Sequence, residues 1–275
     1  MPEGPEIHRA ADKLATALVG SVVEDLYFKF EHLQPWVPHL QGQAIAAVEA
    51  RGKAMLIRFP NQLSIYSHNQ LYGKWMVRKR GSQPKTNRDL RLAIHTQKKS
   101  ALLYSASDIV VLKDEDLGAH DYIRRLGPDL LDEAVTEDDV LARLKDKRFH
   151  RRGLAGLYLN QGFLSGPGNY LRSEILFVAG LHPRRRPCDL DEEALQRLAK
   201  ASLDITRRAY HHRGVTTDPD LAKRLKAKGW TYAKYRHYVF VRAGKTCHVC
   251  GRRIEKDEIS SRRIYICPGC QPREG

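Results

Sequence analysis

The chain has 275 residues and carries 47 Lys and Arg against 32 Asp and Glu, a formal net charge of +15 at pH 7. This length exceeds that of most single domains, so two domains with a small additional module are expected. The positive charge favours a polyanionic partner, which leaves DNA, RNA or an anionic membrane surface as candidates. No apolar run approaches the roughly 20 residues of a spanning helix and no signal-peptide pattern opens the chain, so a soluble cytoplasmic protein is expected.

The first half of the chain predicts one helix followed by strands. Ile7, Ala11, Leu14 and Leu18 fall on one helical face, and Gly20 is a typical C-terminal cap. This helix presents the opening Pro2-Glu-Gly-Pro-Glu6 at its start. Residues 22–112 then change to short apolar stretches separated by turn-forming residues, at 54–59, 63–66, 90–94 and 101–104. Their spacing predicts a β-sandwich.

Helices are predicted beyond a domain boundary near residues 127–135. Thr136 and Asp139 form a capping-box-like start for a helix that runs to about residue 145. Residues 153–181 predict two apolar helices, because the cluster Ser165-Gly-Pro-Gly168 cannot continue a helix. Asn169 is expected to cap the second of them.

A further helix is expected after Asp189 as its cap, through Leu195, Leu198 and Ile205. Residues 207–238 are basic, carry aromatic side chains and show no clear periodicity, so their structure stays open. Arg184-Arg-Arg186 matches no motif, and a solvated basic face is expected there.

Four of the five cysteines predict a metal site near the end of the chain. Cys247 and Cys250 are separated from Cys267 and Cys270 by sixteen residues, the spacing of a four-thiolate structural zinc site. Two disulfides or unrelated thiols are the alternative, which a reducing cytoplasm disfavours. Residues 255–266 between the pairs are strand-prone and predict a zinc-closed β-hairpin. Cys188 lies outside this site and is expected to be incidental.

The tip of this hairpin carries Ser260, Ser261, Arg262 and Arg263. On a basic protein such a tip can grip phosphate, although a solvated turn also explains two arginines.

Several motifs together resemble the Fpg/Nei family of DNA glycosylases. They are Pro2-Glu-Gly-Pro-Glu6, Arg51-Gly-Lys53, Gly168-Asn-Tyr-Leu171 and the terminal cysteine hairpin. The resemblance covers the whole chain, and the stretches 66–73 and 103–109 are closest to the endonuclease VIII branch, which acts mainly on oxidised pyrimidines. It implies an α+β multidomain fold in which DNA crosses the cleft between the domains. The ranges expected are a β-sandwich over 1–127, a helix–two-turn–helix domain over 128–238 and a zinc-finger hairpin over 239–275.

If Met1 is removed, Pro2 carries a free α-amino group. The pKa of such a group is about 2.5 units below that of lysine, so a larger fraction of it is neutral and nucleophilic near pH 7. Such an amine can attack C1′ of a damaged nucleoside, expel the base and leave an iminium, which opens the way to β- and δ-elimination. Glu3 beside it can shuttle protons to the sugar or the departing base. The alternatives are a proline that starts a helix and an acid that stabilises the helix dipole. Glu6, one turn on, is at least as well explained as a surface carboxylate.

The resemblance also assigns phosphate contacts. It implies that Lys53 binds a phosphate beside the lesion and donates a proton, although an isolated lysine in a turn is usually exposed to solvent. It implies that Arg262 clamps phosphate and assists δ-elimination, with Arg263 as its neighbouring alternative. Arg125 and Asn169 match further phosphate contacts, the latter at a helix start.

Gln70, Leu71 and Tyr72 match the residues that fill the gap left by an extruded base, with an apolar wedge, a stacking ring and an amide. The alternative is an ordinary strand end with Leu71 and Tyr72 in the core. The segment 213–237 is longer and more basic than expected of endonuclease VIII, and the resemblance places it beside the lesion pocket.

The predicted function is a bacterial, nucleoid-associated base-excision-repair enzyme that binds one zinc ion and damaged, mainly double-stranded DNA as a monomer. A formamidopyrimidine-type glycosylase for oxidised purines is the first alternative, which residues 70–72 disfavour. A non-enzymatic zinc-containing nucleic-acid-binding protein is the second. It explains the charge and the cysteines but leaves the opening motif unexplained.

Overall fold

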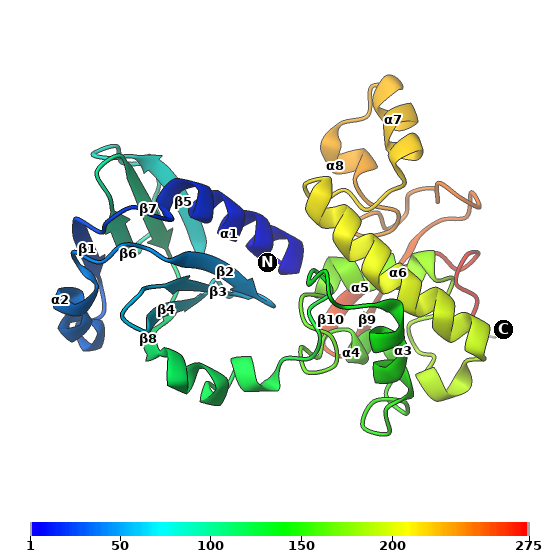
Figure 1. Cartoon of the computed structure of the whole chain (residues 1–275). Coiled ribbons are helices and arrows are strands. Elements are labelled where there is room, and N and C mark those ends of the chain that lie inside the picture. Colours follow the sequence, from blue (N-terminus) through cyan, green and yellow to red (C-terminus); the bar gives the residue numbers. More distant parts are fainter. Residues whose placement is uncertain (1, 274–275) are drawn as a thin grey trace. The chain divides into compact units, whose positions relative to one another are not determined.

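The computed structural model describes residues 2–273 and divides into two compact units. The first comprises residue 2 and residues 6–125, and the second comprises residues 3–5 and the chain from Leu126 onward. Figure 1 labels the elements of both units. Among the helices described, none combines the length and apolar character needed to cross a bilayer.

The first unit is a β-sandwich with one long helix, as predicted. Two antiparallel four-stranded sheets have the strand orders β1-β6-β7-β5 and β2-β3-β4-β8. The strands are β1 (Asp25–Phe28), β2 (Ala47–Arg51), β3 (Ala54–Arg58), β4 (Leu63–His68), β5 (Lys74–Lys79), β6 (Leu90–His95), β7 (Lys99–Tyr104) and β8 (Asp108–Lys113). The helical segments are α1 (Gly4–Leu18), η1 (Glu31–Trp36), α2 (Val37–Leu40), η2 (Asp114–Ala119) and η3 (Ile123–Arg125).

The periodicity of α1 determines its packing. Ala11, Leu14 and Leu18 are buried in the same core as the inward-facing side chains of both sheets. The helix ends just before Gly20, which takes a φ of 77° that favours glycine. The helix starts earlier than residue 7, so that Gly4 already belongs to it. Residues 3–5, at and just before the start of the helix, belong to the second unit.

The second unit is helical and carries one β-hairpin. Its elements are α3 (Glu137–Lys145), α4 (Leu154–Leu157), α5 (Asn169–Val178), η4 (Pro187–Asp189), α6 (Glu192–His211), α7 (Pro219–Ala227), α8 (Tyr232–Tyr235), β9 (Glu255–Ile259) and β10 (Arg262–Ile266). The buried α5 lies against α6 and β10. Ile264 and Ile266 of β10 share one core with α3 to α6, so the hairpin packs directly onto the helices.

The structure confirms the capping box and corrects three helix starts or lengths. Thr136 caps α3 and exchanges hydrogen bonds with Asp139. The first helix of residues 153–181 is only the single turn α4. The N-cap of α5 is Gly168 and not Asn169, which is the first helical residue. The N-cap of α6 is Asp191 and not Asp189, which ends η4 and bonds to Arg186 instead. In both cases the predicted cap lies one or two residues from the true one, which is the usual precision at helix ends.

Candidate functional site

The carboxylate of Glu3 lies at the N-terminus of α5 and is only 2% exposed. Its Oε2 accepts hydrogen bonds from the backbone N–H groups of Gly168 (2.7 Å) and Leu171 (3.2 Å), and its Oε1 accepts one from Tyr170 (2.8 Å). The first N–H groups of a helix have no partner within the helix and carry a partial positive charge. They therefore hold the Glu3 carboxylate, and with it the adjacent Pro2, at a defined place.

Two glycines permit this close approach. A Cβ on Gly168 would come within 2.6 Å of the Glu3 Cδ, and a Cβ on Gly4 would come within 2.8 Å of the Gly166 Cα. The Gly4 N–H also donates to the Gly166 carbonyl at 2.9 Å. Backbone thus packs on backbone here, which only residues without a side chain allow. The spacing of the glycines in both sequence motifs has this physical cause.

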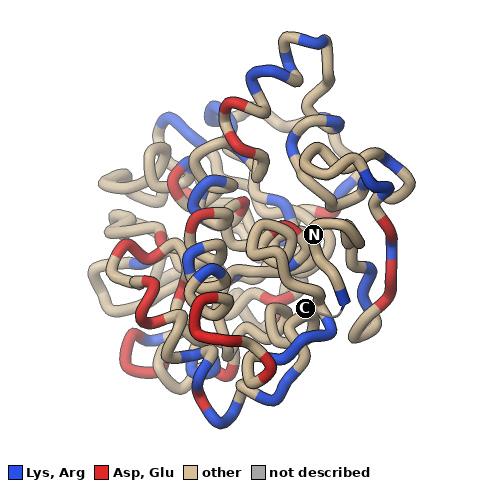
Figure 2. The backbone as a smooth tube through the Cα atoms, turned by 90° about the vertical axis from the view of Figure 1, so that its right-hand side faces the viewer, with Lys and Arg blue, Asp and Glu red and all other residues tan. Residues whose placement is uncertain are grey.

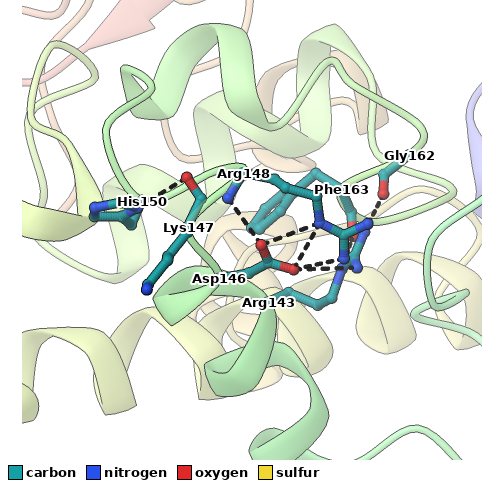
Figure 3. A network of polar contacts seen from close by, with 7 residues as sticks. All are labelled: Arg143, Asp146, Lys147, Arg148, His150, Gly162 and Phe163. Atoms are coloured by element: carbon teal, nitrogen blue, oxygen red, sulfur yellow. Dashed lines mark hydrogen bonds and ion pairs between the residues drawn. The ribbon is translucent and has the colours of Figure 1, made fainter.

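The turn that leads into α5 is supported from α3. Figure 3 shows the Arg143 side chain donating to the carbonyls of Gly162 and Phe163. Next to it, Arg148 bonds both carboxylate oxygens of Asp146, and this hydrogen bonding lowers the pKa of Asp146 to about 2. These contacts fix residues 162–163, which precede the turn at residues 165–168.

Arg172 connects α5 to the hairpin. The side chain is fully buried, and its guanidinium donates to the carbonyls of Arg262 (3.0 Å) and Arg263 (3.1 Å). It also donates to Ala155 (2.9 Å) and, at 3.4 Å, to Ile259. Burial lowers the pKa of Arg172 to about 10, so it remains a cation at neutral pH. The backbone of Arg262 is therefore fixed, while its side chain is exposed.

Arg262 and Arg263 do not lie at the hairpin tip. They are the first two residues of β10, and Arg262 pairs with Ile259. The tip itself is formed by Ser260 and Ser261, both with a positive φ. The predicted hairpin is otherwise confirmed, with β9 and β10 antiparallel between the two cysteine pairs.

The four terminal cysteines converge, and their Sγ atoms all lie within 4.8 Å of one another. The Sγ atoms of Cys247 and Cys270 are 3.9 Å apart, and those of Cys250 and Cys267 are 3.3 Å apart. A disulfide would bring two sulfurs to about 2.05 Å. Four thiolates at about 2.3 Å from one zinc ion in a tetrahedron would lie about 3.8 Å apart. The cluster fits a tetrahedral metal ion.

In the first unit, Lys53 lies in the predicted tight turn between β2 and β3. Arg51 pairs with Ala54 to close the turn, and Gly52 has a φ of 61°. The Lys53 backbone N–H donates to the Tyr122 hydroxyl at 2.9 Å. Lys53 is only 8% exposed, so the general expectation that a turn lysine is solvated is wrong here. A buried lysine in a rigid turn has a fixed position, as a functional group requires.

The loop after β4 presents two large apolar side chains to solvent. Leu71 is 53% exposed and Tyr72 is 69% exposed, which excludes a core role for both. The loop itself is rigid, because the Gly73 N–H donates to the Asn69 carbonyl at 2.7 Å and the Gln70 N–H to His68 Nδ1 at 3.0 Å. Gln70 takes a φ of 49°, and its Oε1 accepts from Ser107 at 2.8 Å. The loop therefore holds an exposed leucine and tyrosine on a fixed backbone.

The structure places the remaining candidates less distinctively. Arg125 is exposed and lies 3.6 Å from Asp121. The Asn169 Oδ1 is buried and has no hydrogen-bond partner among the described residues. Glu6 forms an ion pair with Arg9 at 2.7 Å, in agreement with a surface carboxylate. Arg263 is exposed.

In the triple arginine, Arg184 and Arg186 are exposed, as expected of a solvated face, but both are paired with an acidic side chain. Arg184 pairs with Asp257 and Arg186 with Asp189, both at 2.8 Å. Cys188 is exposed and lies outside the cysteine cluster.

Sequence reasoning missed two buried charges on α5, Arg172 and Glu174. Glu174 accepts from the Thr216 hydroxyl (2.5 Å) and from the backbone N–H groups of residues 238–240. A signal was present, because both charges interrupt an otherwise apolar helix in residues 169–178. Charged residues within an apolar segment are rarely buried without partners.

Comparison with known proteins agrees with this architecture. The model of the formamidopyrimidine-DNA glycosylase N-terminal domain matches residues 1–107, and that of the formamidopyrimidine-DNA glycosylase H2TH domain matches residues 126–219. Endonuclease 8 of Klebsiella pneumoniae is 46% identical over 271 residues, which cover 98% of this chain and 100% of the relative. Endonuclease 8 of Salmonella agona is 48% identical with the same coverage. The chain belongs to the formamidopyrimidine-DNA glycosylase/endonuclease 8 family.

Members of this family are DNA glycosylases with abasic-site lyase activity, and the chain is an enzyme of that kind, which acts in base excision repair. Its fold is also that of solved structures of Lactococcus lactis Fpg. One of these, in complex with DNA that contains N7-benzyl-Fapy-dG, has a TM-score of 0.82 at 18% identity and covers 99% of this chain and 100% of that chain. Another, in complex with DNA that contains an oxidised pyrimidine, has the same TM-score, identity and coverage.

Proposed function

We propose that this enzyme removes oxidised pyrimidines from DNA with the N-terminal amine of Pro2 as its nucleophile and then cuts the strand by β,δ-elimination. The observation that carries the proposal is the burial of the Glu3 carboxylate against three N–H groups of α5. This arrangement fixes the residue next to Pro2, so that an amine and a carboxylate stay side by side. Such a pair supplies a nucleophile and a proton-transfer group to one sugar.

The chemistry requires the removal of Met1, which lies outside the described residues. The free Pro2 nitrogen then forms a bond to C1′ of the damaged nucleoside while the glycosidic bond breaks and the base leaves with its electron pair. The departing base takes up a proton, and the Pro2 nitrogen loses its own. The C1′–O4′ bond then breaks while the nitrogen lone pair forms a C1′=N⁺ double bond, and O4′ takes up a proton as the sugar ring opens. The resulting iminium acidifies the 2′ hydrogen. Loss of that hydrogen expels the 3′ phosphate, and a second elimination expels the 5′ phosphate. Glu3 is the proposed proton carrier for the sugar and the base.

The cationic and intercalating residues have proposed roles around this step. Lys53 and Arg262 neutralise phosphates next to the lesion, and Arg262 assists the second elimination. The exposed Leu71 and Tyr72 enter the gap left by the extruded nucleotide, with Gln70 facing the orphan base. Arg125 and Asn169 contact further phosphates. The tight turn at Lys53 and the rigid loop at Gln70 support these assignments, because both hold their side chains in place without a ligand.

We further propose that the four cysteines hold one zinc ion that shapes the hairpin. The fit of their sulfur positions to a tetrahedron supports this assignment. The ion would act on the fold and take no part in the reaction, because four thiolates leave no open coordination position. Elemental analysis should give about one zinc per chain.

Damaged duplex DNA is the proposed substrate of a monomeric enzyme in the bacterial cytoplasm, associated with the nucleoid. The identity of 46–48% to proteins named endonuclease 8 supports an oxidised pyrimidine as the base. A pyrimidine with a saturated 5,6 bond is non-planar and stacks poorly, so it leaves the helix at lower cost. Single-turnover assays should show faster excision of thymine glycol than of 8-oxoguanine opposite cytosine. Faster excision of 8-oxoguanine would favour the formamidopyrimidine-type alternative and leave the Pro2 chemistry intact.

Borohydride trapping tests the nucleophile. Wild-type enzyme mixed with an abasic-site oligonucleotide and borohydride should give a covalent adduct that maps to Pro2. A preparation that retains Met1 should give none, since its amine belongs to another residue. An adduct mapped to Lys53 in the wild type would overturn the assignment.

Glu3→Gln separates the roles of the pair. The amide cannot carry a proton to the base, so base excision should fall while much of the cleavage at preformed abasic sites remains. Equal retention of both activities would remove Glu3 from the mechanism.

A further inference from the structure

A helical segment, residues 213–238, lies largely beyond the part of the chain that the H2TH domain model matches. We call it the insertion, because the sequence here is longer than the family resemblance leads us to expect. That match ends at residue 219, where α7 begins, and α8 follows before the hairpin. Within the second unit, α7 and α8 project from the C-terminal end of α6 (Figure 1). The insertion has its own small core, formed by Val215, Ala222, Leu225 and Tyr235 with Leu221 and Trp230 packed against it. It is therefore a folded element and not an irregular loop.

Hydrogen bonds close the base of this insertion. Thr217 Oγ1 donates to the Tyr235 carbonyl at 2.9 Å, and the Asp218 N–H donates to the Tyr238 hydroxyl at 2.9 Å. Asp218 also caps α7 by accepting from the N–H groups of the first helical turn. Tyr232 donates its hydroxyl proton to the Arg213 carbonyl at 2.6 Å. These contacts order the insertion before any ligand arrives, which lowers the entropic cost of binding.

A concave site of about 490 Å³ lies between the insertion and the end of α6. This volume is within the range of roughly 300–1,000 Å³ that small-ligand sites have. The site is lined by the end of α6, the start of the insertion, α7 and α8, and its lining residues include Arg213, Lys223, Lys226, Tyr232 and Tyr235. None of these lining residues is acidic. The lining instead combines three permanent cations with two tyrosine rings.

The cations of this site are not neutralised. Arg213, Lys223 and Lys226 are exposed, and within residues 2–273 none of them forms an ion pair. Figure 2 shows Lys and Arg positions along the uppermost segment, which is the insertion. Like charges held close together repel one another and create a positive potential that an anion relieves. The three exposed cations thus give the site a positive potential that favours an anionic ligand.

The aromatic part of the site adds a second contact. Tyr232 is 42% exposed, and the Arg236 guanidinium lies 5.2 Å from its ring centre. Lys226 lies 5.0 Å from the ring centre of Tyr235, which is buried in the small core, so Tyr232 is the exposed ring of the site. Cations next to exposed rings are the usual combination in proteins that bind single-stranded nucleic acid, where rings stack on bases and cations contact phosphates. In a duplex the bases are already stacked inside the helix and cannot reach such a ring.

We propose that this site binds a nucleotide of a single-stranded DNA segment, with its phosphate at Arg213 and Lys223 and its base against Tyr232. The insertion thereby gives the enzyme a second contact with DNA that is separate from the lesion. Its partner is unpaired DNA of any sequence, since the site offers stacking and charge.

Arg213→Gly with Lys223→Gln provides a variant that should still fold. Arg213 has a φ of 54°, a left-handed conformation that glycine adopts at no steric cost. The double variant loses two positive charges from the site. Lys228→Gln with Lys234→Gln loses the same charge from exposed positions of the insertion that do not line the site. A comparison of thermal unfolding should show that both variants keep the wild-type fold.

The measurement is fluorescence anisotropy with an undamaged, labelled oligothymidylate and with an undamaged duplex. The site variant should bind the single strand on the order of tenfold more weakly than wild type. The slope of log K against log salt should fall by about 0.7, the value for one lost phosphate contact on a single strand. The control variant should lose less single-strand affinity than the site variant, and its salt slope should fall by less. The duplex affinity of the site variant should stay within about twofold of wild type.

Three results would overturn the proposal. Equal losses in the site and control variants would show an effect of net charge only. Equal losses for single strand and duplex would show that the insertion belongs to the general duplex contact. Unchanged single-strand binding with slower excision of thymine glycol would place the insertion at the lesion. Because the oligonucleotides are undamaged, failure of the Pro2 chemistry would not affect this test.

Discussion

Arg172 and Glu174 lie two residues apart on α5, are both fully buried and carry opposite charges. At 3.6 residues per turn, side chains two positions apart point about 200° away from each other. Arg172 accordingly reaches the start of β10, and Glu174 reaches the residues that follow α8. One short helix thus holds two segments that are distant from it in sequence.

The sign of each charge follows from the backbone it meets. The hairpin presents carbonyls near its turn, which need donors, and the guanidinium supplies several donors in a fixed plane. Residues 238–240 present three N–H groups, which need an acceptor, and a carboxylate supplies two oxygens. A buried charge is destabilising unless it is hydrogen-bonded or paired. Irregular backbone next to a functional element can therefore be ordered by a single buried charge of the matching sign.

The N-terminus of α5 adds a third anchor by holding Glu3. The helix therefore carries the proposed proton carrier, the backbone of Arg262 and the base of the insertion. A change in either buried charge should affect only the segment that it holds, which the following variants test.

Arg172→Met should have the largest effect. It leaves several carbonyls without a donor in a buried region, and breaking such a charged network costs about 3–5 kcal/mol. Urea denaturation should show a lower midpoint at an unchanged m-value. The strand-cleavage products should also shift away from δ-elimination, because the Arg262 backbone loses its support.

Arg172→Lys is the matched control for this variant. It keeps the charge but offers fewer donors without the planar fork, so its loss of stability should be intermediate. A Met variant as stable as wild type would show that the hairpin does not depend on this residue.

Glu174→Gln should have a smaller and more local effect. The amide keeps one acceptor oxygen but turns an NH₂ group toward backbone donors, a mismatch that costs about 1–3 kcal/mol. Hydrogen exchange should become faster in residues 214–240, with little change in residues 255–266. Equal acceleration in the hairpin would contradict the separation of the two anchors.

The sequence predicts well what depends on local periodicity and spacing. The sandwich follows from alternating strands, α1 from one apolar face, and the convergence of Cys247 to Cys270 from two paired spacings. The motif at Pro2 and Glu3 was found because its residues are adjacent. Arg172 and Glu174 cannot be recognised in this way, because the hairpin carbonyls and the N–H groups of residues 238–240 that they hold lie 64 to 91 positions away along the chain. Neither hydropathy nor spacing reports such partners.

The same limit explains why the structure of residues 207–238 could not be predicted from the sequence. Its helices are short, and α8 has only four residues, so periodicity has no room to show. The burial of Lys53 was likewise invisible, and its backbone N–H bonds Tyr122, which lies 69 positions away in the same unit. The N-cap of α6 is Asp191, two residues from the predicted Asp189, and this difference is within the usual precision at helix ends.

His237 provides a test on the Glu174 side of the helix. Replacing it should change the free energy of unfolding little at neutral pH and more in acid. Its ring is 3% exposed and lies 5.3 Å from the Tyr170 ring and 5.5 Å from the Phe240 ring. Burial, with help from Arg236 and Arg242, lowers the pKa of His237 to about 3. An unfolded histidine titrates near 6.5, so between these values the unfolded chain binds a proton that the folded chain does not. The stability that neutral His237 allows above pH 6.5 is therefore lost progressively as the pH falls toward 3.

His237→Phe keeps an aromatic ring and removes the titration. The difference in unfolding free energy between wild type and variant should be nearly constant above pH 7. Below pH 6 it should move against the wild type by about 1.4 kcal/mol per pH unit, the value for one proton. Carboxylates such as Asp146, whose pKa is held at about 2 by Arg148, titrate in both proteins and cancel in this difference. Parallel stability curves from pH 7 to pH 4 would show that His237 is protonated in the folded protein, and the buried environment around Glu174 would then have to be open to water.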